Sequence, residues 1–521
     1  MHTKFIYKLV SVCLSILYLS HNSYSQTESY YNSETLFLVK NPWFYTSNAA
    51  ASSLFKKDAY LETLISYNNK SGDFKKITDP ISFDNYSLDF FALKRVNGFT
   101  YMGRFKFLES FSKDKRWTYL MDADSEIPYI IGDSIRSSFR KELLDVNISV
   151  SHSLLSPKLD AGIMFYYKSA IGVKDVDPRP INTLSKVSFT PSLLYKYSDF
   201  SRFAASFKYC LRNEKIEVRK LTFAQSNLFL FSGLGFVSTE TMLAAFNRSY
   251  NTYSREVELS FQYDDEYEFM TFSKLSFLSE NTNIEDGKDL VKLEYCFLNR
   301  EVSLKSFFDL QCEDLFHALI VDFFLSESLG IRNIINKERK DNYFEWKRYA
   351  EKDECFKEVF SVSVEYKLKF QTWQNNITLS GFSSREEYEF YPTVFFQDYN
   401  NIYLKYYINK SVKISNCILN ISASIASRQN LSKESYLLDS GNATSFNVED
   451  LSDEVLVSAH DNNFDYNTCD YISKFFRLQL DMHIRAFKQV TQACFAVEYK
   501  DTNTRDFGNT RLLSLSLGIK L

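Results

Sequence analysis

The sequence has 521 residues, of which 24% are charged and 17% aromatic, and its formal net charge is −4. This charge balance offers no strongly basic surface, so nucleic acid is not an expected partner. Beyond residue 26, no run approaches the roughly 18 consecutive apolar residues of a membrane helix, which excludes helical membrane proteins.

The first 25 residues have the layout of a secretory signal peptide. Lys4 and Lys8 give a positively charged start, residues 9–19 form a short apolar core, and residues 23–25 supply small side chains at the cleavage position. The apolar core is too short to span a bilayer comfortably. We therefore expect export and cleavage; the alternative is a retained N-terminal anchor.

Residues 26–59 form an N-terminal segment without regular alternation of apolar and polar side chains. Residues 36–55 (LFLVKNPWFYTSNAAASSLF) are too apolar for a free tail, and residues 48–55 suit a short helix. We expect this segment to pack as a small plug in the lumen, or over the inner mouth, of the barrel described below. The alternative is an ordinary first strand with a turn. The residues assigned to the plug are Asn41, Pro42, Trp43 and Asn48.

From residue 60 onward, many segments alternate between apolar and polar side chains with a period of two. The clearest is 360–370, where Val362, Val364, Tyr366 and Leu368 alternate with serine, glutamate and lysine. One apolar face over about ten residues is typical of a tilted membrane strand. The same pattern occurs at 101–107, 146–151, 203–209, 257–263, 476–485 and 513–521.

The connections between these strands predict the architecture. Tight connections are expected at 96–98, 156–158, 199–201, 299–300, 409–411 and 488–489. Long connections are expected at 110–144, 170–185, 213–254, 312–358, 383–400 and 427–472. Tight and long connections alternate, as in outer-membrane barrels with short periplasmic turns and long extracellular loops. The prediction is an all-β, antiparallel, up-and-down transmembrane β-barrel over residues 60–521, with about 18 strands within a range of roughly 14 to 18.

The last strand is expected to close the barrel against the first. Leu513, Leu515, Leu517, Ile519 and Leu521 alternate with polar residues or glycine. A strand at the end of a chain leaves backbone groups unpaired unless another strand covers them. The leucine and isoleucine face should then contact lipid and the serine face should line the lumen.

Basic residues predominate on the polar faces that would line the lumen. A net positive lumen favours anionic solutes; the alternative is a lumen filled by paired charges that conducts nothing. The basic residues that we propose for lumen binding are Arg104, Lys106, Lys367, Lys369, Arg477 and Arg485.

A rigid loop motif occurs at 177–180. Pro178 and Pro180 restrict the backbone on either side of Arg179. Arg179 is expected to lie over the lumen or to pair with a loop carboxylate, and a structural role is favoured over ligand binding. Asp177 and Arg179 are the residues of this motif that we propose for lumen or loop binding.

Signals for catalysis are weak. The chain has no GxSxG, HExxH, GxGxxG or P-loop motif and no CxxC pair, and its histidines lack metal-binding spacing. We expect no catalytic residue, no metal and no cofactor. Cys312 and Cys355 are a candidate disulfide across one long loop, and the alternative is that both are free.

Two short motifs carry a family resemblance. Residues 41–43 (Asn-Pro-Trp) with 48–50 (Asn-Ala-Ala), and the loop 172–180, resemble an uncharacterised Bacteroidota outer-membrane β-barrel family, a domain of unknown function. The Asn-Pro pair is also similar, more weakly, to the N-terminal segment of fatty-acid transporter-like barrels, although Trp43 stands where those have a small residue. The resemblance implies a location and a fold, and no reaction.

These features predict a location in the bacterial outer membrane. The favoured function is a binding or accessory component of a surface uptake or secretion assembly. A channel or transporter for small, anionic solutes is the alternative, and an outer-membrane enzyme is less favoured. The expected partners are outer-membrane lipid and a TonB-dependent receptor or another envelope protein, and the cargo is unknown.

Overall fold

The structure is a computed structural model, and it describes most of the chain beyond the N-terminal region. The described residues are 42–55, 58–121, 127–154, 156–221, 226–233, 237–242, 245–265, 269–287, 291–312, 315–340, 343–390, 393–438, 464–486, 489–504 and 508–520. The predicted signal peptide therefore lies outside the described residues.

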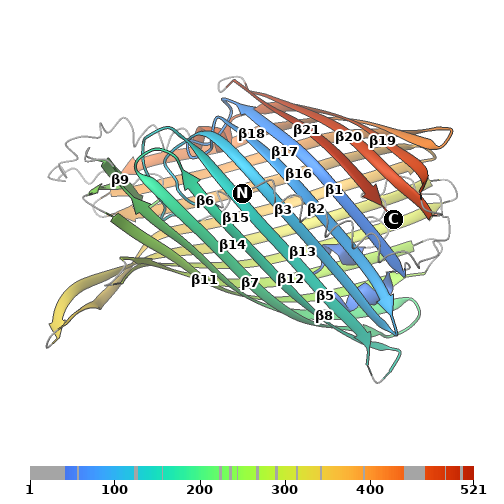
Figure 1. Ribbon diagram of the computed structural model, residues 1–521, viewed down its shortest axis with the longest axis horizontal. Coiled ribbons are helices and arrows are strands. Elements are labelled where there is room, and N and C mark those ends of the chain that lie inside the picture. Colours follow the sequence, from blue (N-terminus) through green and yellow to red (C-terminus); the bar gives the residue numbers. More distant parts are fainter. Residues whose placement is uncertain are drawn as a thin grey trace.

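Eighteen antiparallel strands form one closed barrel (Figure 1). They are β1 (Ala59–Gly72), β2 (Ser82–Val96), β3 (Phe99–Lys115), β5 (Ser137–Ser153), β6 (Leu159–Lys174), β7 (Arg179–Lys196), β8 (Ser201–Arg219), β11 (Ala245–Asp264), β12 (Phe269–Asp286), β13 (Lys292–Cys312), β14 (Leu315–Lys340), β15 (Tyr343–Phe370), β16 (Trp373–Phe390), β17 (Thr393–Ile414), β18 (Cys417–Leu438), β19 (Tyr471–Ala486), β20 (Gln489–Thr504) and β21 (Asn509–Lys520). Each strand pairs with the next barrel strand along the chain, and β21 pairs with β1, with Leu517 opposite Ile65. The predicted fold, strand number and closure are confirmed.

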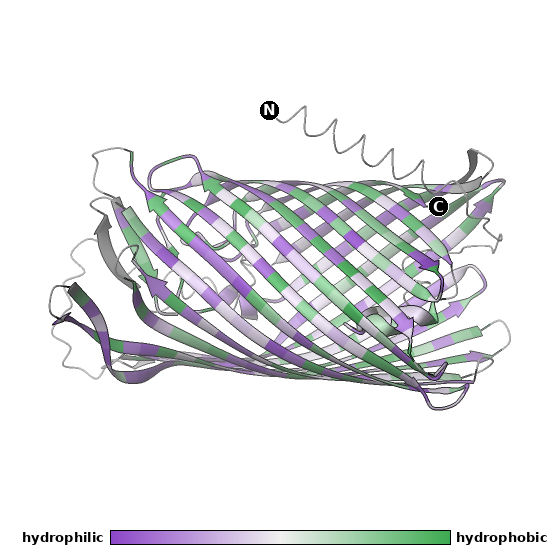
Figure 2. Cartoon of the chain, turned by 60° about the horizontal axis from the view of Figure 1, so that its bottom comes forward, coloured by the Kyte–Doolittle hydropathy of each residue, from purple (hydrophilic) through white to green (hydrophobic). Residues whose placement is uncertain are grey.

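The barrel wall has an apolar outer face and a polar inner face over its membrane-spanning part. Figure 2 shows hydrophobic and hydrophilic residues alternating along the strands. On β21, Leu517 and Ile519 are exposed on the outer face, whereas Ser514 and Lys520 are buried on the inner face. The predicted facing of the closing strand is therefore confirmed. This alternation places the apolar side chains against lipid and leaves the backbone groups paired within the sheet.

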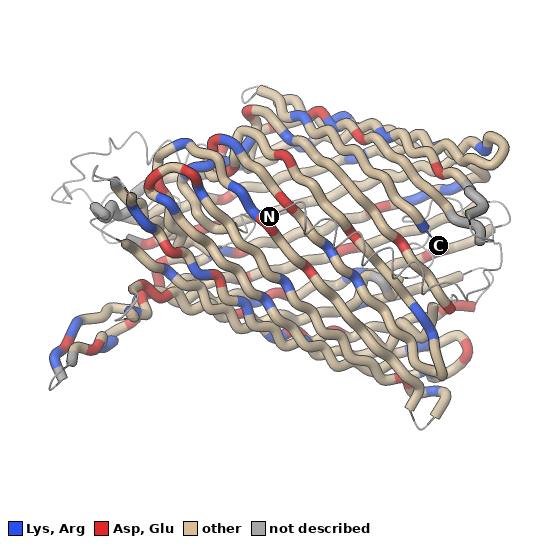
Figure 3. The backbone as a smooth tube through the Cα atoms, in the orientation of Figure 1, with Lys and Arg blue, Asp and Glu red and all other residues tan. Residues whose placement is uncertain are grey.

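The two ends of the barrel differ in their connections. The start of β1 and the end of β21 lie at the end with tight turns, here called the inner end, where Asn97 and Gly98 have φ values of 51° and 80°. The opposite, outer end carries the longer connections. The β14–β15 hairpin protrudes beyond this rim and bears charged residues along its length (Figures 1 and 3).

Several predicted connections are wrong, including the long loops 170–185 and 383–400, which lie mostly within β6, β7, β16 and β17. Residues 299–300 lie inside β13 and residues 409–411 lie inside β17. In both segments, successive side chains alternate between the inner and outer faces of the wall. The predicted long loop 312–358 is mostly strand, because β14 and β15 pair with each other to their ends. Asparagine suggests a turn in isolation, but Asn299 and Asn409 face the polar lumen, which accepts them within a strand, whereas Arg300 and Lys410 are exposed on the outer face.

Small elements outside the barrel sheet lie at both ends. β4 (Ile131–Gly132), β9 (Ser226–Phe231) and β10 (Val237–Met242) form a separate three-stranded sheet. Two short 3-10 helices, η1 (Pro42–Tyr45) and η2 (Ala49–Leu54), precede β1. Among the described residues, none of the helices is long and apolar enough to cross a membrane.

The candidate disulfide does not form. Cys312 pairs across strands with Leu315, whereas Cys355 pairs with Gly330 further along β14. Fifteen residues of strand separate those partners, or about 50 Å at about 3.3 Å per residue. Both cysteines are free, and Cys355 is buried.

Candidate functional site in the barrel lumen

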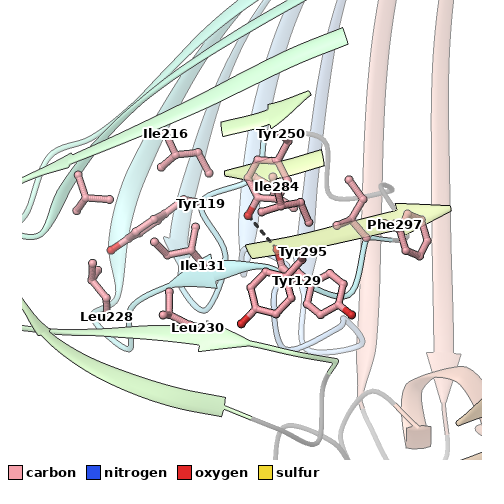
Figure 4. Packing of buried hydrophobic residues seen from close by; sticks show 13 residues of the cluster. Tyr119, Tyr129, Ile131, Ile216, Leu228, Leu230, Tyr250, Ile284, Tyr295 and Phe297 are labelled. Carbon is pink, nitrogen blue, oxygen red and sulfur yellow. Dashed lines mark hydrogen bonds between the residues drawn. The ribbon is translucent and has the colours of Figure 1, made fainter. Parts of the chain in front are cut away.

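The outer half of the lumen is filled by the barrel's own connections. Residues 119–120, 127 and 129–131, together with residues of β9, turn inward and pack against inward-facing residues of β8 and β11–β13 (Figure 4). We call this inward-folded unit the outer lid. At its centre, Tyr129 stacks on Tyr295 at a ring-centroid distance of 4.1 Å, and the Tyr250 hydroxyl donates to the Tyr129 carbonyl oxygen at 3.0 Å. The buried members of this cluster are Tyr119, Leu120, Ile127, Tyr129, Ile131, Ile216, Val218, Leu228, Leu230, Tyr250, Ile284, Tyr295 and Phe297.

The wall beneath the lid has reversed polarity. On β8, Ile216 and Val218 point inward and are fully buried, whereas Lys215, Glu217 and Arg219 point outward and form ion pairs with one another. In the membrane-spanning part, the apolar face points outward instead. The reversal occurs because the outer surface of the rim meets water and its inner surface meets the apolar lid.

Buried polar contacts fix the lid in place. The Lys174 ammonium donates to an Asp133 carboxylate oxygen at 2.7 Å, and both side chains are buried. The Tyr119 hydroxyl donates to the same carboxylate, and burial together with Asp133 raises the pKa of Tyr119 well above its ordinary value. The Met121 amide donates to the Glu214 carboxylate of β8 at 2.8 Å. A charged group that is buried this deeply is stable only when it is paired, so these contacts select one lid position.

Close approach of the lid to the wall depends on a glycine. A Cβ atom at Gly330 of β14 would lie 2.7 Å from the Tyr129 hydroxyl oxygen and 2.9 Å from the Cys355 Cβ. Any larger side chain at this position would push against the lid. Gly330 therefore lies where Tyr129 of the lid contacts β14.

The inner half of the lumen holds the N-terminal segment. The Trp43 indole donates to the Gln262 amide oxygen at 2.6 Å, and its ring packs edge-on against Phe272. The Asn48 amide donates to the carbonyl oxygens of Leu193 and Ala205, both at 3.1 Å. Residues 42–55 therefore pack against the inner wall, as a plug would. Trp43 and Asn48, predicted for the plug, lie at these contacts; Pro42 begins η1, and Asn41 lies outside the described residues.

The segment approaches β6 backbone to backbone. A Cβ atom at Gly162 would lie 2.3 Å from the Ala50 amide nitrogen. Beside it, the Ser53 hydroxyl donates to Asp160, which also forms an ion pair with Lys196 at 2.8 Å. Residues 42–55 are thus held by hydrogen bonds and by a position where a side chain cannot fit.

The wall formed by β1 and β17–β21 carries a polar recess, away from the plug. The Arg477 guanidinium donates to Gln479 at 2.7 Å and lies 3.2 Å from Glu498, and Gln479 donates to Asp481 at 3.0 Å. The Asn420 amide also donates to Asp481, at 2.8 Å. The recess is lined by Glu62, Leu64, Ser66, Tyr407, Asn409, Asn420, Ser422, Arg477, Gln479, Cys494, Ala496, Glu498, Ser514, Ser516 and Lys520.

Three of the six predicted lumen cations, Arg104, Lys367 and Arg477, form ion pairs with carboxylates among the described residues. Arg104 forms a two-point ion pair with Asp89, with one nitrogen–oxygen distance of 3.0 Å, and Lys367 lies 3.5 Å from Glu365. Lys106 and Lys369 are half-buried on the same inner faces, on β3 and β15. Arg485 lies in β19, and its side chain is outside the described part of the chain. These three predicted cations are therefore neutralised by carboxylates, and of the six predicted residues Arg477 lines the polar recess.

The loop motif at 177–180 is held by hydrogen bonds within the protein. The Arg179 guanidinium donates to an Asp177 carboxylate oxygen at 2.9 Å, and the other oxygen accepts from the Leu221 amide at 3.1 Å. The Asp177–Pro178 peptide bond is cis. These contacts tie the β6–β7 connection to the end of β8, which fits the structural role favoured from the sequence.

The lid residues were not found by sequence reasoning. Tyr129, Ile131, Leu228 and Leu230 sit in segments that were predicted to be extracellular loops. One signal was present: when the alternation of β8 is extended beyond the membrane band, Ile216 falls on the inner face. An apolar inner face at a barrel rim requires something apolar to cover it.

Comparisons with known proteins were made against families, curated proteins and solved structures. No curated protein matches the chain. Among solved structures, the ferric enterobactin receptor PfeA of Pseudomonas aeruginosa has a TM-score of 0.39 at 7% identity, with 89% of this chain and 80% of that chain covered. The ferric preacinetobactin receptor BauA of Acinetobacter baumannii gives 0.38 at 6%, covering 89% and 80%. The RagAB peptide importer gives 0.36 at 6%, covering 90% and 87%.

The match to a family covers η2 and the whole barrel. The model of a family of unknown function, DUF6850, matches residues 49–521. This confirms the resemblance to an uncharacterised barrel family that the sequence motifs suggested. The chain belongs to this family of unknown function, DUF6850.

Proposed function

We propose that the protein is a binding or accessory component of an outer-membrane uptake or secretion assembly, with a lumen that its own chain keeps closed at rest. The observation that carries this proposal is the occupation of the lumen at both ends. The lid packs under the outer rim, with Tyr129 against Tyr295, and residues 42–55 pack under the inner rim, with Trp43 against Phe272. An open solute channel needs neither contact.

The proposed partner is a TonB-dependent receptor or another envelope protein. A barrel that is closed at rest needs a second component to move its cargo or to move the lid. The protruding β14–β15 hairpin places charged and aromatic residues outside the rim, where a surface partner could reach them; Phe344 and Tyr349 are more than half exposed. The neutralised charges along the wall support a cargo that is not selected by net negative charge.

The test uses conductance in planar bilayers and three glycine variants of the full mature protein. Gly162→Val should unseat the N-terminal segment, and Gly330→Val should displace the lid, because a Cβ at either position meets atoms closer than 3 Å. Gly381→Val is the matched control, since a Cβ there meets nothing within 4 Å. We expect no steady conductance from the native protein or from Gly381→Val, and steady conductance from the Gly162→Val/Gly330→Val double variant.

Two results would contradict the proposal. Steady conductance by the native protein would favour the channel alternative, and its ion selectivity would then show whether anions are preferred. A double variant that folds, as judged by a heat-dependent gel shift, and still conducts nothing would show that these two contacts do not close the lumen.

A further inference from the structure

Two arginines point outward from the barrel wall, towards the membrane. Arg255 of β11 lies on the same face as Tyr253 and Val257, which are 48% and 42% exposed. Arg300 of β13 lies on the same face as Leu304, which is 41% exposed. Both arginines are themselves exposed. They therefore project from the apolar side of the wall, whereas Arg104 and Arg477 project into the lumen.

The strand register places the two arginines in one row. Ser279 of β12 pairs with Arg255 on one side and with Arg300 on the other. Neighbouring strands lie about 4.8 Å apart, so the two arginine Cα atoms are about 10 Å apart and both long side chains can reach one ligand. Ser279 and the next outward residue of β12, Asn281, are exposed between them and add a hydroxyl and an amide.

The row lies at the outer edge of the apolar band. On β11, the outward positions from Phe261 to Val257 are apolar, Arg255 and Tyr253 follow, and Asn251 begins a polar stretch towards the outer rim. On β12, Phe277 is the last exposed apolar residue before Ser279. Tyrosines at such a boundary are typical of the interfacial aromatic girdle. The arginines are therefore at the depth of outer-leaflet head groups.

Neither guanidinium forms an ion pair with the described residues. Within the described part of the chain, no carboxylate lies within 4.0 Å of Arg255 or Arg300, although Glu327 of β14 is the cross-strand neighbour of Arg300. Lipid-facing cations are unfavourable in proportion to their depth, so an arginine at this height needs an anion beside it. Guanidinium groups bind phosphate through two parallel hydrogen bonds, which makes phosphate the fitting anion.

We propose that Arg255 and Arg300, with Ser279 and Asn281 between them, form a binding site for the phosphate-bearing head group of an outer-leaflet glycolipid. The acyl chains lie along the apolar side chains below the row, and the sugar hydroxyls meet Ser279 and Asn281. The site lies on the outside of the barrel and does not depend on the state of the lumen. It holds the barrel at a set depth and surrounds this face with one class of lipid.

The test measures lipid retention by native mass spectrometry of the full mature protein in detergent. The probes are diphosphoryl lipid A, its dephosphorylated form and inorganic phosphate. The native protein should retain diphosphoryl lipid A, and Arg255→Gln/Arg300→Gln should bind it about tenfold more weakly, the equivalent of one lost charge-assisted hydrogen bond. The dephosphorylated lipid should bind the native protein as weakly as diphosphoryl lipid A binds the variant.

The matched control is Lys94→Gln/Arg140→Gln, which also removes two outward cations. Lys94 lies near the inner rim, and Arg140 is paired with Glu109 and Glu142 at 2.6 Å and 2.9 Å. This control should retain lipid like the native protein. Equal retention by the native protein and the Arg255/Arg300 variant, with both folded by gel shift, would overturn the proposal. If inorganic phosphate at low millimolar concentration displaces diphosphoryl lipid A from the native protein, the row is a site for free anions instead of a lipid site.

Discussion

At the scale of single residues, the direction in which a side chain points decides what it contributes. Leu517 and Ser516 are neighbours on β21, yet Leu517 is 52% exposed on the outer face and Ser516 borders the polar recess. The same substitution at these two positions should therefore have different effects.

Leu517→Arg should reduce assembly more than Ser516→Arg. An arginine that faces lipid costs about 2–4 kcal/mol at the bilayer midplane and less near the interfaces, and Leu517 lies near the middle of the apolar run of β21. At Ser516 the new side chain enters a polar lumen. The measurement is the amount of heat-modifiable, folded barrel in outer membranes, and equal amounts for the two variants would reject this facing.

A second residue-scale prediction concerns Arg248 under the lid. Its guanidinium is fully buried and forms two hydrogen bonds of 2.6 Å with Asp286. Asp286→Ala should destabilise the fold by about 3–5 kcal/mol, because it leaves a buried cation without its partner. The double variant Arg248→Met/Asp286→Leu should lose much less. The temperature midpoint of the gel shift checks this order, and a double variant that is as unstable as Asp286→Ala would contradict it.

At the scale of elements, the closing strand belongs to the barrel wall, whereas the inward-folded segments belong to the lumen. β21 completes the sheet by pairing with β1 from Lys520 opposite Glu62 to Thr510 opposite Gly72. The lid and the N-terminal segment occupy the lumen without adding a strand to the wall. Loss of β21 should therefore harm assembly, whereas movement of the lid should change only what passes through.

Removal of residues 512–521 should reduce folded protein more than either arginine substitution on β21. The deletion uncovers backbone groups of β1 and β20 within the membrane, where each unsatisfied group costs several kcal/mol. Heat-modifiable protein in outer membranes is again the measurement. Normal levels of a folded truncated barrel would show that β21 is not needed for closure.

At the scale of the whole molecule, the strand order sets the topology. Both chain ends of the barrel lie at the end with tight turns, and the long connections lie at the other end. Apolar and polar side chains alternate along the strands. In the closed barrel this alternation separates a lipid-facing outer surface from a polar lumen, and the lid and residues 42–55 pack at the two ends of the lumen.

Epitope tags should report this topology on intact cells. Tags in the connections at Asn342 and Asn442 should be labelled, and tags in the turns at Asn97 and Gln371 should not. Permeabilised cells are the control, in which all four tags should be labelled. If the turn tags are labelled on intact cells as strongly as the loop tags, the orientation of the barrel is reversed.

The sequence by itself determined the wall of the barrel. Alternation such as that around Val362, Val364 and Lys367 depends on the solvent on each face of a strand, and lipid on one side with a polar lumen on the other imposes it locally. Strand number, closure by β21 and the outward leucines could therefore be predicted. Residues 409–411 could not be assigned correctly, because Asn409 and Ser411 suggest a turn yet are equally stable in a strand when they face the lumen.

Only the tertiary structure decided how the lumen is filled. The contact between Tyr129 and Tyr250 joins residues 121 positions apart, and the contact between Trp43 and Gln262 joins residues 219 apart. Neither leaves a periodic trace in the sequence. The row of Arg255 and Arg300 likewise follows from the register of three strands. In the sequence, each arginine is a single polar residue in its own segment, and nothing local indicates that the two lie side by side. Local periodicity reports the environment of each face, and only the fold reports which faces meet.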